Sequence, residues 1–122
     1  MKRRQLPLTP AERDLVVASL RYFDGIRYQL RGYVVMDDHV HVLVDTRAGF
    51  PLSSLLHTWK SYTSHEFIKR GWRCSPVWKR SAHDNVITTK IRLVRALQYI
   101  ELNPIRRWGS SQQYPWVWTE PY

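Results

Sequence analysis

The residues most suggestive of chemistry are His39 and His41, which lie one residue apart inside an apolar run. Successive side chains of a β-strand point to opposite faces, so a strand here would send both imidazoles to one face, close enough to hold one metal ion. Val40, Val42 and Val44 would then point the other way, towards a core. The pattern indicates a metal site, although two surface histidines on a half-exposed strand would have the same spacing.

A second group of reactive residues follows much later in the chain, on a predicted amphipathic helix. Tyr99 and Asn103 are four residues apart and would be neighbours on its surface. The same face would carry three arginines, namely Arg92, Arg95 and, if the helix continues beyond Pro104, Arg106. A phenol among cations, one turn from an amide oxygen that can ligate a hard cation, is a specific arrangement. A half-buried tyrosine on a solvated basic helix is the plain alternative.

The elements that must position these residues can be read from capping signals and apolar spacing. A capping box at Thr9 and Glu12 predicts a helix to about residue 25, followed by a hairpin with strands at 27–36 and 39–45 joined at Asp37-Asp38. After a loop at 47–51, a helix is expected at 52–70 and a short strand at 77–80. The tyrosine helix begins after a threonine near Thr88 and should stop at Pro104. The aromatic tail, 108–122, is expected to pack irregularly.

Composition points to one domain that binds nucleic acid. The 122 residues suffice for a single core, and 19 Lys and Arg against 10 Asp and Glu give a net charge of +9. Six tryptophans and seven tyrosines lie among these cations, a mixture that suits the phosphates and unstacked bases of single strands. Charge alone does not separate DNA from RNA or an anionic membrane. Cys74 is the only cysteine, so neither a disulfide nor a thiolate metal cluster is expected.

The two histidines and the tyrosine belong to an ordered series of motifs. The series runs Gly32–Val44, Lys60-Ser61-Tyr62-Thr63-Ser64, Pro76-Val77-Trp78, Asp84 with Val86-Ile87, Tyr99-Ile100-Glu101-Leu102-Asn103-Pro104 and Tyr114-Pro115-Trp116. Together these motifs resemble the single-tyrosine transposases with a histidine-hydrophobe-histidine (HUH) strand, IS200-like proteins, and most closely their REP-associated tyrosine transposase branch. The resemblance spans residues 8–118. It implies an α+β, ferredoxin-like antiparallel sheet with helices packed on one side.

The resemblance also implies a reaction and roles for the site residues. His39, His41 and Asn103 would bind a divalent metal, Mg²⁺ or Mn²⁺, and Tyr99 would be the nucleophile that becomes joined to a 5′ phosphate of single-stranded DNA. The substrate would be a hairpin-forming repetitive palindrome. The expected nucleic-acid contacts are Lys60, Arg92, Arg95 and Arg106. No organic cofactor, membrane span or signal peptide is expected, so the protein should be a cytoplasmic, nucleoid-associated bacterial protein. Both a monomer and a homodimer are compatible with the sequence.

Two departures from the family pattern bear on these expectations. The family sheet begins with a strand beside the HUH strand, and residues 1–10, with their basic residues and two prolines, cannot easily supply it. A start assigned too late, a truncated remnant, or another segment or subunit filling the gap would each account for this. Asp37 stands where the family usually has proline, which should affect the turn more than the chemistry. Asp84 is expected either to cap the last helix or to support a site histidine.

Two other functions remain open at this stage. One is a catalytically inactive, truncated nucleic-acid-binding domain descended from the same family. The other is a metal-dependent hydrolase of a small phosphoester, which would use the same histidines with water as nucleophile. The hydrolase would have no use for Tyr99 or for the net charge of +9.

Overall fold

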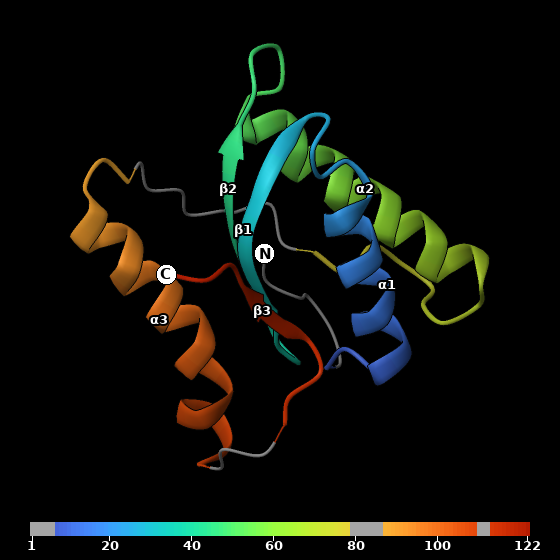
Figure 1. Ribbon diagram of the computed structural model, residues 1–122. Helices are drawn as coiled ribbons and strands as arrows, with labels where there is room; N and C mark the ends of the chain where they lie inside the picture. Colours follow the sequence, from blue (N-terminus) through green and yellow to red (C-terminus); the bar gives the residue numbers. More distant parts are fainter. Residues whose placement is uncertain (1–6, 79–86, 110–112) are drawn as a thin grey trace.

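The computed structural model describes residues 7–78, 87–109 and 113–122 and contains helices and strands in a mixed order (Figure 1). The elements are α1 Pro10–Tyr22, β1 Tyr28–Val35, β2 Val40–Thr46, α2 Leu52–Lys69, α3 Lys90–Trp108 and β3 Val117–Thr119. The predicted helices and the hairpin are all present. The short strand expected at 77–80 lies partly outside the described residues; Val77 and Trp78, which are described, are buried.

The sheet has the order β2-β1-β3, and β1 is antiparallel to both neighbours. The expectation of an irregular tail is therefore wrong at residues 117–119, where Val117 pairs with Val34 and Thr119 with Gly32. A strand of three residues is too short to show a readable alternation, which is why the sequence did not reveal it. An antiparallel α+β fold, as predicted, is confirmed.

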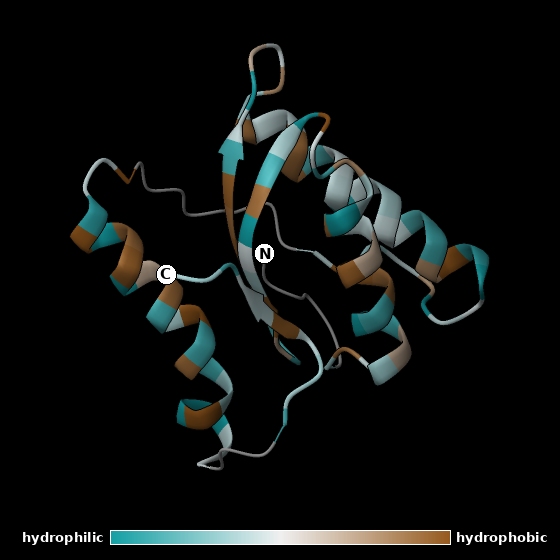
Figure 2. Ribbon diagram, viewed as in Figure 1, coloured by the Kyte–Doolittle hydropathy of each residue, from teal (hydrophilic) through white to brown (hydrophobic). Residues whose placement is uncertain are grey.

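The helices cover both faces of the sheet, which corrects the expectation that they pack on one side. Figure 1 shows α3 on one side of the strands and α1 with α2 on the other. The reason is that consecutive residues of β1 are buried from Gly32 to Val35, so both faces of the strand are covered there. Figure 2 shows hydrophobic residues in the helices on both sides of the sheet. The β1 side chains Tyr28, Leu30, Tyr33 and Val35 pack in a core with α1 and α2, whereas Val34 packs with Ile100 of α3. An irregularity in the pairing with β2 between Leu30 and Gly32 shifts the alternation and lets both faces be filled.

Helix α3 approaches β1 closely at Gly32. A Cβ atom at this position would lie 3.3 Å from Leu97 Cδ2 and 3.3 Å from the Trp118 carbonyl oxygen. The absence of a side chain therefore lets the helix rest directly on the sheet. Leu97 and Ile100, the α3 residues at this contact, are both buried.

The sequence predicted that helix α3 stops at Pro104, and this prediction is wrong, because the helix continues for another turn. Pro104 lies inside the helix, which ends at Trp108 with Gly109 as its left-handed C-cap (φ 67°). Proline removes one helical N–H, but the burial of Asn103 and Pro104 against the body of the protein keeps the helix in place. The additional turn brings Arg106 and Arg107 into the helix.

The outer edge of β2 has no paired strand among the described residues, since β2 is the last strand in the sheet order. This agrees with the expected absence of a strand beside the histidine strand. Of the helices in the described segments, none is long and apolar enough to cross a membrane.

A buried ion pair ties α1 to the segment after α2. Glu12 is 1% exposed, and its carboxylate accepts hydrogen bonds from Arg73 Nε and Nη2 at 2.6 and 2.7 Å and from the Thr9 backbone N–H at 2.9 Å. Burial acts to raise the pKa of the Glu12 carboxyl, but the hydrogen bonds from Arg73 and Thr9 outweigh it, so the pKa lies below its ordinary value. The ionised form of Glu12 therefore stabilises the fold.

We expect Glu12→Gln to lower the free energy of unfolding by about 2 kcal/mol, because it leaves the buried Arg73 guanidinium without its counter-charge. Since folding lowers the pKa of Glu12, the carboxylate's contribution is complete above the unfolded-state pKa of about 4.3 and is lost as the pH falls through the folded-state pKa. Urea unfolding from about pH 7 down to pH 3 should therefore lose stability more steeply in the native chain than in Glu12→Gln.

The matched control is Glu66→Gln, which removes the partner of the half-exposed Arg70 one turn away on α2. This variant should cost only about 0.4 kcal/mol. Equal pH slopes for the native chain and Glu12→Gln would contradict the assignment.

Candidate active site

The two histidines meet on the face of the sheet that α3 covers. His41 is paired with Val34, whose side chain packs against α3, whereas Val40 and Val42 belong to the core on the opposite face. The imidazole centroids of His39 and His41 are 4.6 Å apart, with the rings nearly perpendicular. The alternation read from the sequence therefore holds in the structure.

Tyr99 of α3 lies against this pair. Its ring centroid is 5.1 Å from that of His41, and the side chain remains 45% exposed. The Arg106 guanidinium lies 4.9 Å from the centre of the Tyr99 ring. Asn103, one turn after Tyr99 on the same helix, is buried at 7% exposure. A phenol that is open to solvent thus stands between an imidazole and a guanidinium.

The donors around the histidines fit a divalent cation of the hard or intermediate type. No group of three His, Cys, Asp or Glu side chains that could hold a metal is found within the described residues. The Asn103 amide therefore stays a predicted third ligand beside the two imidazoles. Nitrogen and amide-oxygen ligands without thiolate suit Mg²⁺ or Mn²⁺, and two imidazoles would also accept Zn²⁺. His39 Nδ1 lies 2.5 Å from Asp38 Oδ1, which leaves Nε2 of that ring for a cation. A carboxylate behind an imidazole is the usual support for a metal-binding histidine.

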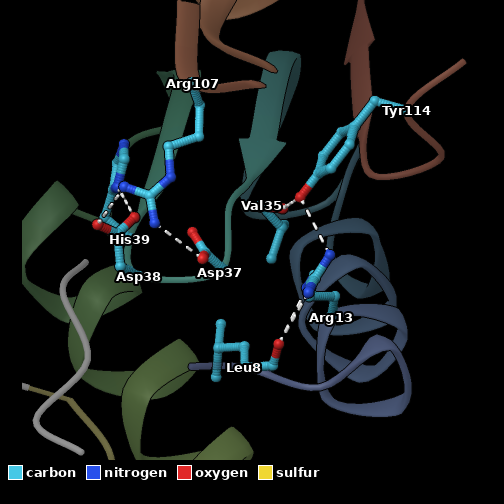
Figure 3. A network of polar contacts seen from close by, with 8 residues as sticks. All are labelled: Leu8, Arg13, Val35, Asp37, Asp38, His39, Arg107 and Tyr114. Carbon is cyan, nitrogen blue, oxygen red and sulfur yellow. Dashed lines mark hydrogen bonds and ion pairs between the residues drawn. The ribbon is translucent and has the colours of Figure 1, made fainter. Parts of the chain in front are cut away.

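The supporting carboxylate belongs to Asp38 in the turn between β1 and β2 (Figure 3). Burial acts to raise the pKa of the Asp38 carboxyl, but its hydrogen bond to His39, with the nearby charges of His39 and Arg107, outweighs burial and lowers the pKa. From the sequence, Asp38 was interpreted mainly as a turn residue, and the supporting role was considered for Asp84, which lies outside the described residues. The adjacency of Asp38 to His39 was the signal that could have identified it.

Arg107 is the contact that the sequence analysis missed. Its Nη2 donates to Asp37 Oδ2 at 2.9 Å, and its Nη1 lies 3.6 Å from Asp38 Oδ2. It was overlooked because the helix was expected to end at Pro104, before this residue. Asp37, for which only an effect on the turn was expected, thus holds the last turn of α3. Its other oxygen, Oδ1, is buried without a hydrogen-bond partner among the described residues.

The predicted nucleic-acid contacts are divided between the two faces of the sheet. Arg92 and Arg95 are exposed on α3, on the helix that carries Tyr99 and Arg106. Lys60 lies instead on α2, which packs on the opposite face, and burial lowers the pKa of its ammonium group. The structure therefore brings the arginines, and not the lysine, onto the element that carries the phenol.

The sequence profile described as "Transposase IS200 like" matches residues 2–102 of the chain, well over half its length. The chain belongs to the IS200-like transposase family. The family named from the motifs is thereby confirmed. No curated protein matches this transposase. Its fold is similar to that of a solved structure described as a REP-associated tyrosine transposase bound to a REP hairpin, with a TM-score of 0.74 and 16% sequence identity, covering 95% of this chain and 71% of the other.

We expect this transposase to bind Mn²⁺ through the two histidines. His41→Ala should weaken binding by about 100-fold, because loss of even an outer partner of a metal ligand costs about 10–100-fold. Titration followed by the electron paramagnetic resonance of free Mn²⁺ measures this directly. The matched control is His65→Ala, a histidine exposed on α2. Equal affinities for the two variants would contradict a cation site at the histidine pair.

Proposed function

We propose that this IS200-like transposase cleaves single-stranded DNA and transfers the strand through a covalent bond between Tyr99 and a 5′ phosphate. The single observation that carries the proposal is the position of the Tyr99 ring, 5.1 Å from His41 and beside the His39–His41 pair. The phenol and the imidazoles come from elements far apart in the sequence, and α3 also presents Arg92 and Arg95 to solvent. A solvated tyrosine without a function would have no need of this convergence.

The reaction follows from the groups that converge. The phenolic oxygen of Tyr99 attacks the scissile phosphorus, and the bond from phosphorus to the 3′ oxygen breaks. The 3′ oxygen takes up a proton and leaves as a free 3′-OH, while the phenolic proton passes to solvent. Attack by a second 3′-OH on the tyrosyl phosphodiester reverses the step and rejoins the strands. No ATP is required, because the number and type of phosphodiester bonds are conserved.

The residues around Tyr99 would have separate roles in the reaction at the scissile phosphate. His39, His41 and Asn103 would hold a divalent cation, which when bound neutralises charge on the scissile phosphate. The Arg106 guanidinium, 4.9 Å from the centre of the Tyr99 ring, would place a positive charge beside the phosphate under attack. Asp38 accepts the Nδ1 hydrogen of His39 and so orients that ring. No side chain among these is needed as a general base if solvent accepts the phenolic proton.

The proposed substrate is a hairpin-forming, repetitive palindromic single strand. The similar solved structure is described as bound to a REP hairpin, and the net charge of +9 suits a polyanion. Exposed rings on the α3 side, such as Tyr99 and Trp108, offer surfaces on which unpaired bases can stack.

A second candidate is a protein of the same family that binds such DNA without cutting it. The observation that favours it is the small sheet, which has three strands among the described residues, with the histidine strand β2 last in their order. A site on a strand at the end of the order has fewer neighbouring strands to fix its position, and a displacement of about 1 Å can remove most of the activity.

The decisive experiment is a denaturing-gel assay for a covalent protein–DNA adduct. Single-stranded palindromic oligonucleotides are incubated with the native chain and with Tyr99→Phe, in Mn²⁺ and in EDTA. We expect an adduct only with the native chain and Mn²⁺, because phenylalanine has no oxygen to form the phosphodiester. Tyr62→Phe, which alters a half-exposed tyrosine on α2 across the sheet, is the matched control and should form the adduct normally.

The other outcomes separate the alternatives. DNA binding without an adduct in either metal condition would favour the binding-only protein. Cleavage that survives Tyr99→Phe would indicate water as the nucleophile and would exclude the tyrosyl mechanism.

The basic surface of α3 gives a prediction for DNA affinity. Replacing Arg92 and Arg95 by alanine should weaken binding of single-stranded DNA and reduce the slope of log K against log salt by about 1.4, since each phosphate contact contributes about 0.7. Fluorescence anisotropy over a salt series measures the slope. Arg70→Ala with Lys69→Ala, at the end of α2, is the charge-matched control. An equal reduction in both double variants would show a non-specific charge effect.

A further inference from the structure

The last turn of α3 is fixed to the turn that carries the first histidine. Arg107 contacts two successive carboxylates there: Nη2 is 2.9 Å from Asp37 Oδ2, and Nη1 is 3.6 Å from Asp38 Oδ2 (Figure 3). One guanidinium therefore reaches both aspartates through separate Nη atoms, a geometry that the shorter side chain and compact ammonium of a lysine would not reproduce.

The Asp38 carboxylate is shared between Arg107 and His39. Its Oδ2 faces Arg107, while its Oδ1 is 2.5 Å from His39 Nδ1. An ionised carboxylate only accepts hydrogen bonds, so His39 donates from Nδ1, and in the neutral ring this is the tautomer that leaves Nε2 without hydrogen. The Arg107 guanidinium attracts the other oxygen, Oδ2, and so favours the carboxylate orientation in which Oδ1 faces His39.

Arg106 and Arg107, consecutive on α3, serve the two halves of the site. The Arg106 guanidinium lies over the Tyr99 ring, whereas Arg107 reaches the turn beside His39. The helix that carries the phenol is thus tied to the turn that precedes the histidine strand. A shift of α3 along the sheet would separate Arg107 from both aspartates.

The environment of Asp37 indicates more than a turn residue. Its Oδ2 accepts from Arg107, while its Oδ1 is buried without a partner among the described residues. A turn alone needs no such carboxylate, because leaving a buried polar atom unpaired is unfavourable. Asp37 is best explained as the anchor that holds the Arg107 guanidinium against Asp38.

We propose that Arg107 is a positioning residue, which acts through Asp38 to fix the tautomer and orientation of His39 relative to α3. The role of His39 as a metal ligand rests on the proposed function, whereas the contacts of Arg107 with the two aspartates do not. Arg107 contacts Asp37 and Asp38, and Asp38 in turn contacts His39, so the effect of Arg107 on this ring is transmitted through Asp38. Because its side chain is 44% exposed, its ion pairs contribute little to the overall stability of the fold.

The test compares Arg107→Ala with the native chain in three measurements. Long-range ¹H–¹⁵N NMR of the metal-free protein should show His39 with hydrogen on Nδ1 in the native chain and a shift towards the Nε2–H tautomer in the variant. Mn²⁺ affinity should fall by about tenfold, as for other residues that support a metal ligand. The melting temperature should change by about 4 °C or less.

Two further variants separate a positioning role of Arg107 from a general effect of losing an arginine or a positive charge. Arg70→Ala removes an arginine of similar exposure, 49%, that also pairs with a carboxylate near a helix end, and it should leave the His39 signals unchanged. Arg107→Lys keeps the charge but does not reproduce the planar fork that reaches both aspartates through separate Nη atoms, so it should not restore the native tautomer.

An unchanged His39 tautomer or an unchanged Mn²⁺ affinity in Arg107→Ala overturns the proposal. Recovery of the native tautomer in Arg107→Lys also overturns it, because charge alone would then suffice. The proposed function fails separately, if the native chain forms no tyrosyl adduct with DNA. In that case the NMR measurement of the His39 tautomer still tests the role of Arg107, since it requires neither metal nor DNA.

Discussion

The close approach of α3 to β1 at Gly32 determines the rest of the site. A Cβ atom at this position would lie 3.3 Å from Leu97 Cδ2 of α3 and 3.3 Å from the Trp118 carbonyl oxygen of β3. Because Gly32 presents only backbone, α3 lies low enough over the sheet for Tyr99 to reach His41 on the neighbouring strand. Burial of Ile100 against Val34 holds this contact together by the hydrophobic effect. The distance between Tyr99 and His41 is therefore set by the packing of α3 against the sheet.

The features with a strong local period could be predicted from the sequence. The phase of His39 and His41 and the basic face of α3 follow from repeats of two and 3.6 residues, and the capping box of α1 follows from its Thr-x-x-Glu spacing. The assignment of helices to faces could not be predicted, because it depends on the irregularity in β1 between Leu30 and Gly32. Likewise β3 is three residues long, and the passage of α3 beyond Pro104 depends on tertiary burial that no local rule describes.

The candidate site likewise contains contacts that a local sequence pattern predicts and contacts that depend on tertiary packing. Asp38 supports His39 through adjacency in a turn, which is local, whereas Tyr99 and Arg107 reach their partners only through the docking of α3. The family was identifiable because its motifs are short runs of neighbouring residues, which can be recognised without knowing the tertiary contacts. Arg107 has no motif of its own and gains significance only from its position over two carboxylates. Sequence patterns therefore identify the reacting groups better than the contacts that orient them.

The pairing of β3 with β1 affects when the chain can become reactive. During synthesis the two histidines, β1 and α2 all emerge before Tyr99, and the strand that completes the sheet emerges later still. Such long-range pairings raise the contact order and delay folding, because a large loop must close before the contacts form. A nascent chain would therefore carry both imidazoles without the phenol. Tyr99 and the histidines meet only after α3 has docked, so the candidate site is assembled late in the synthesis of the chain.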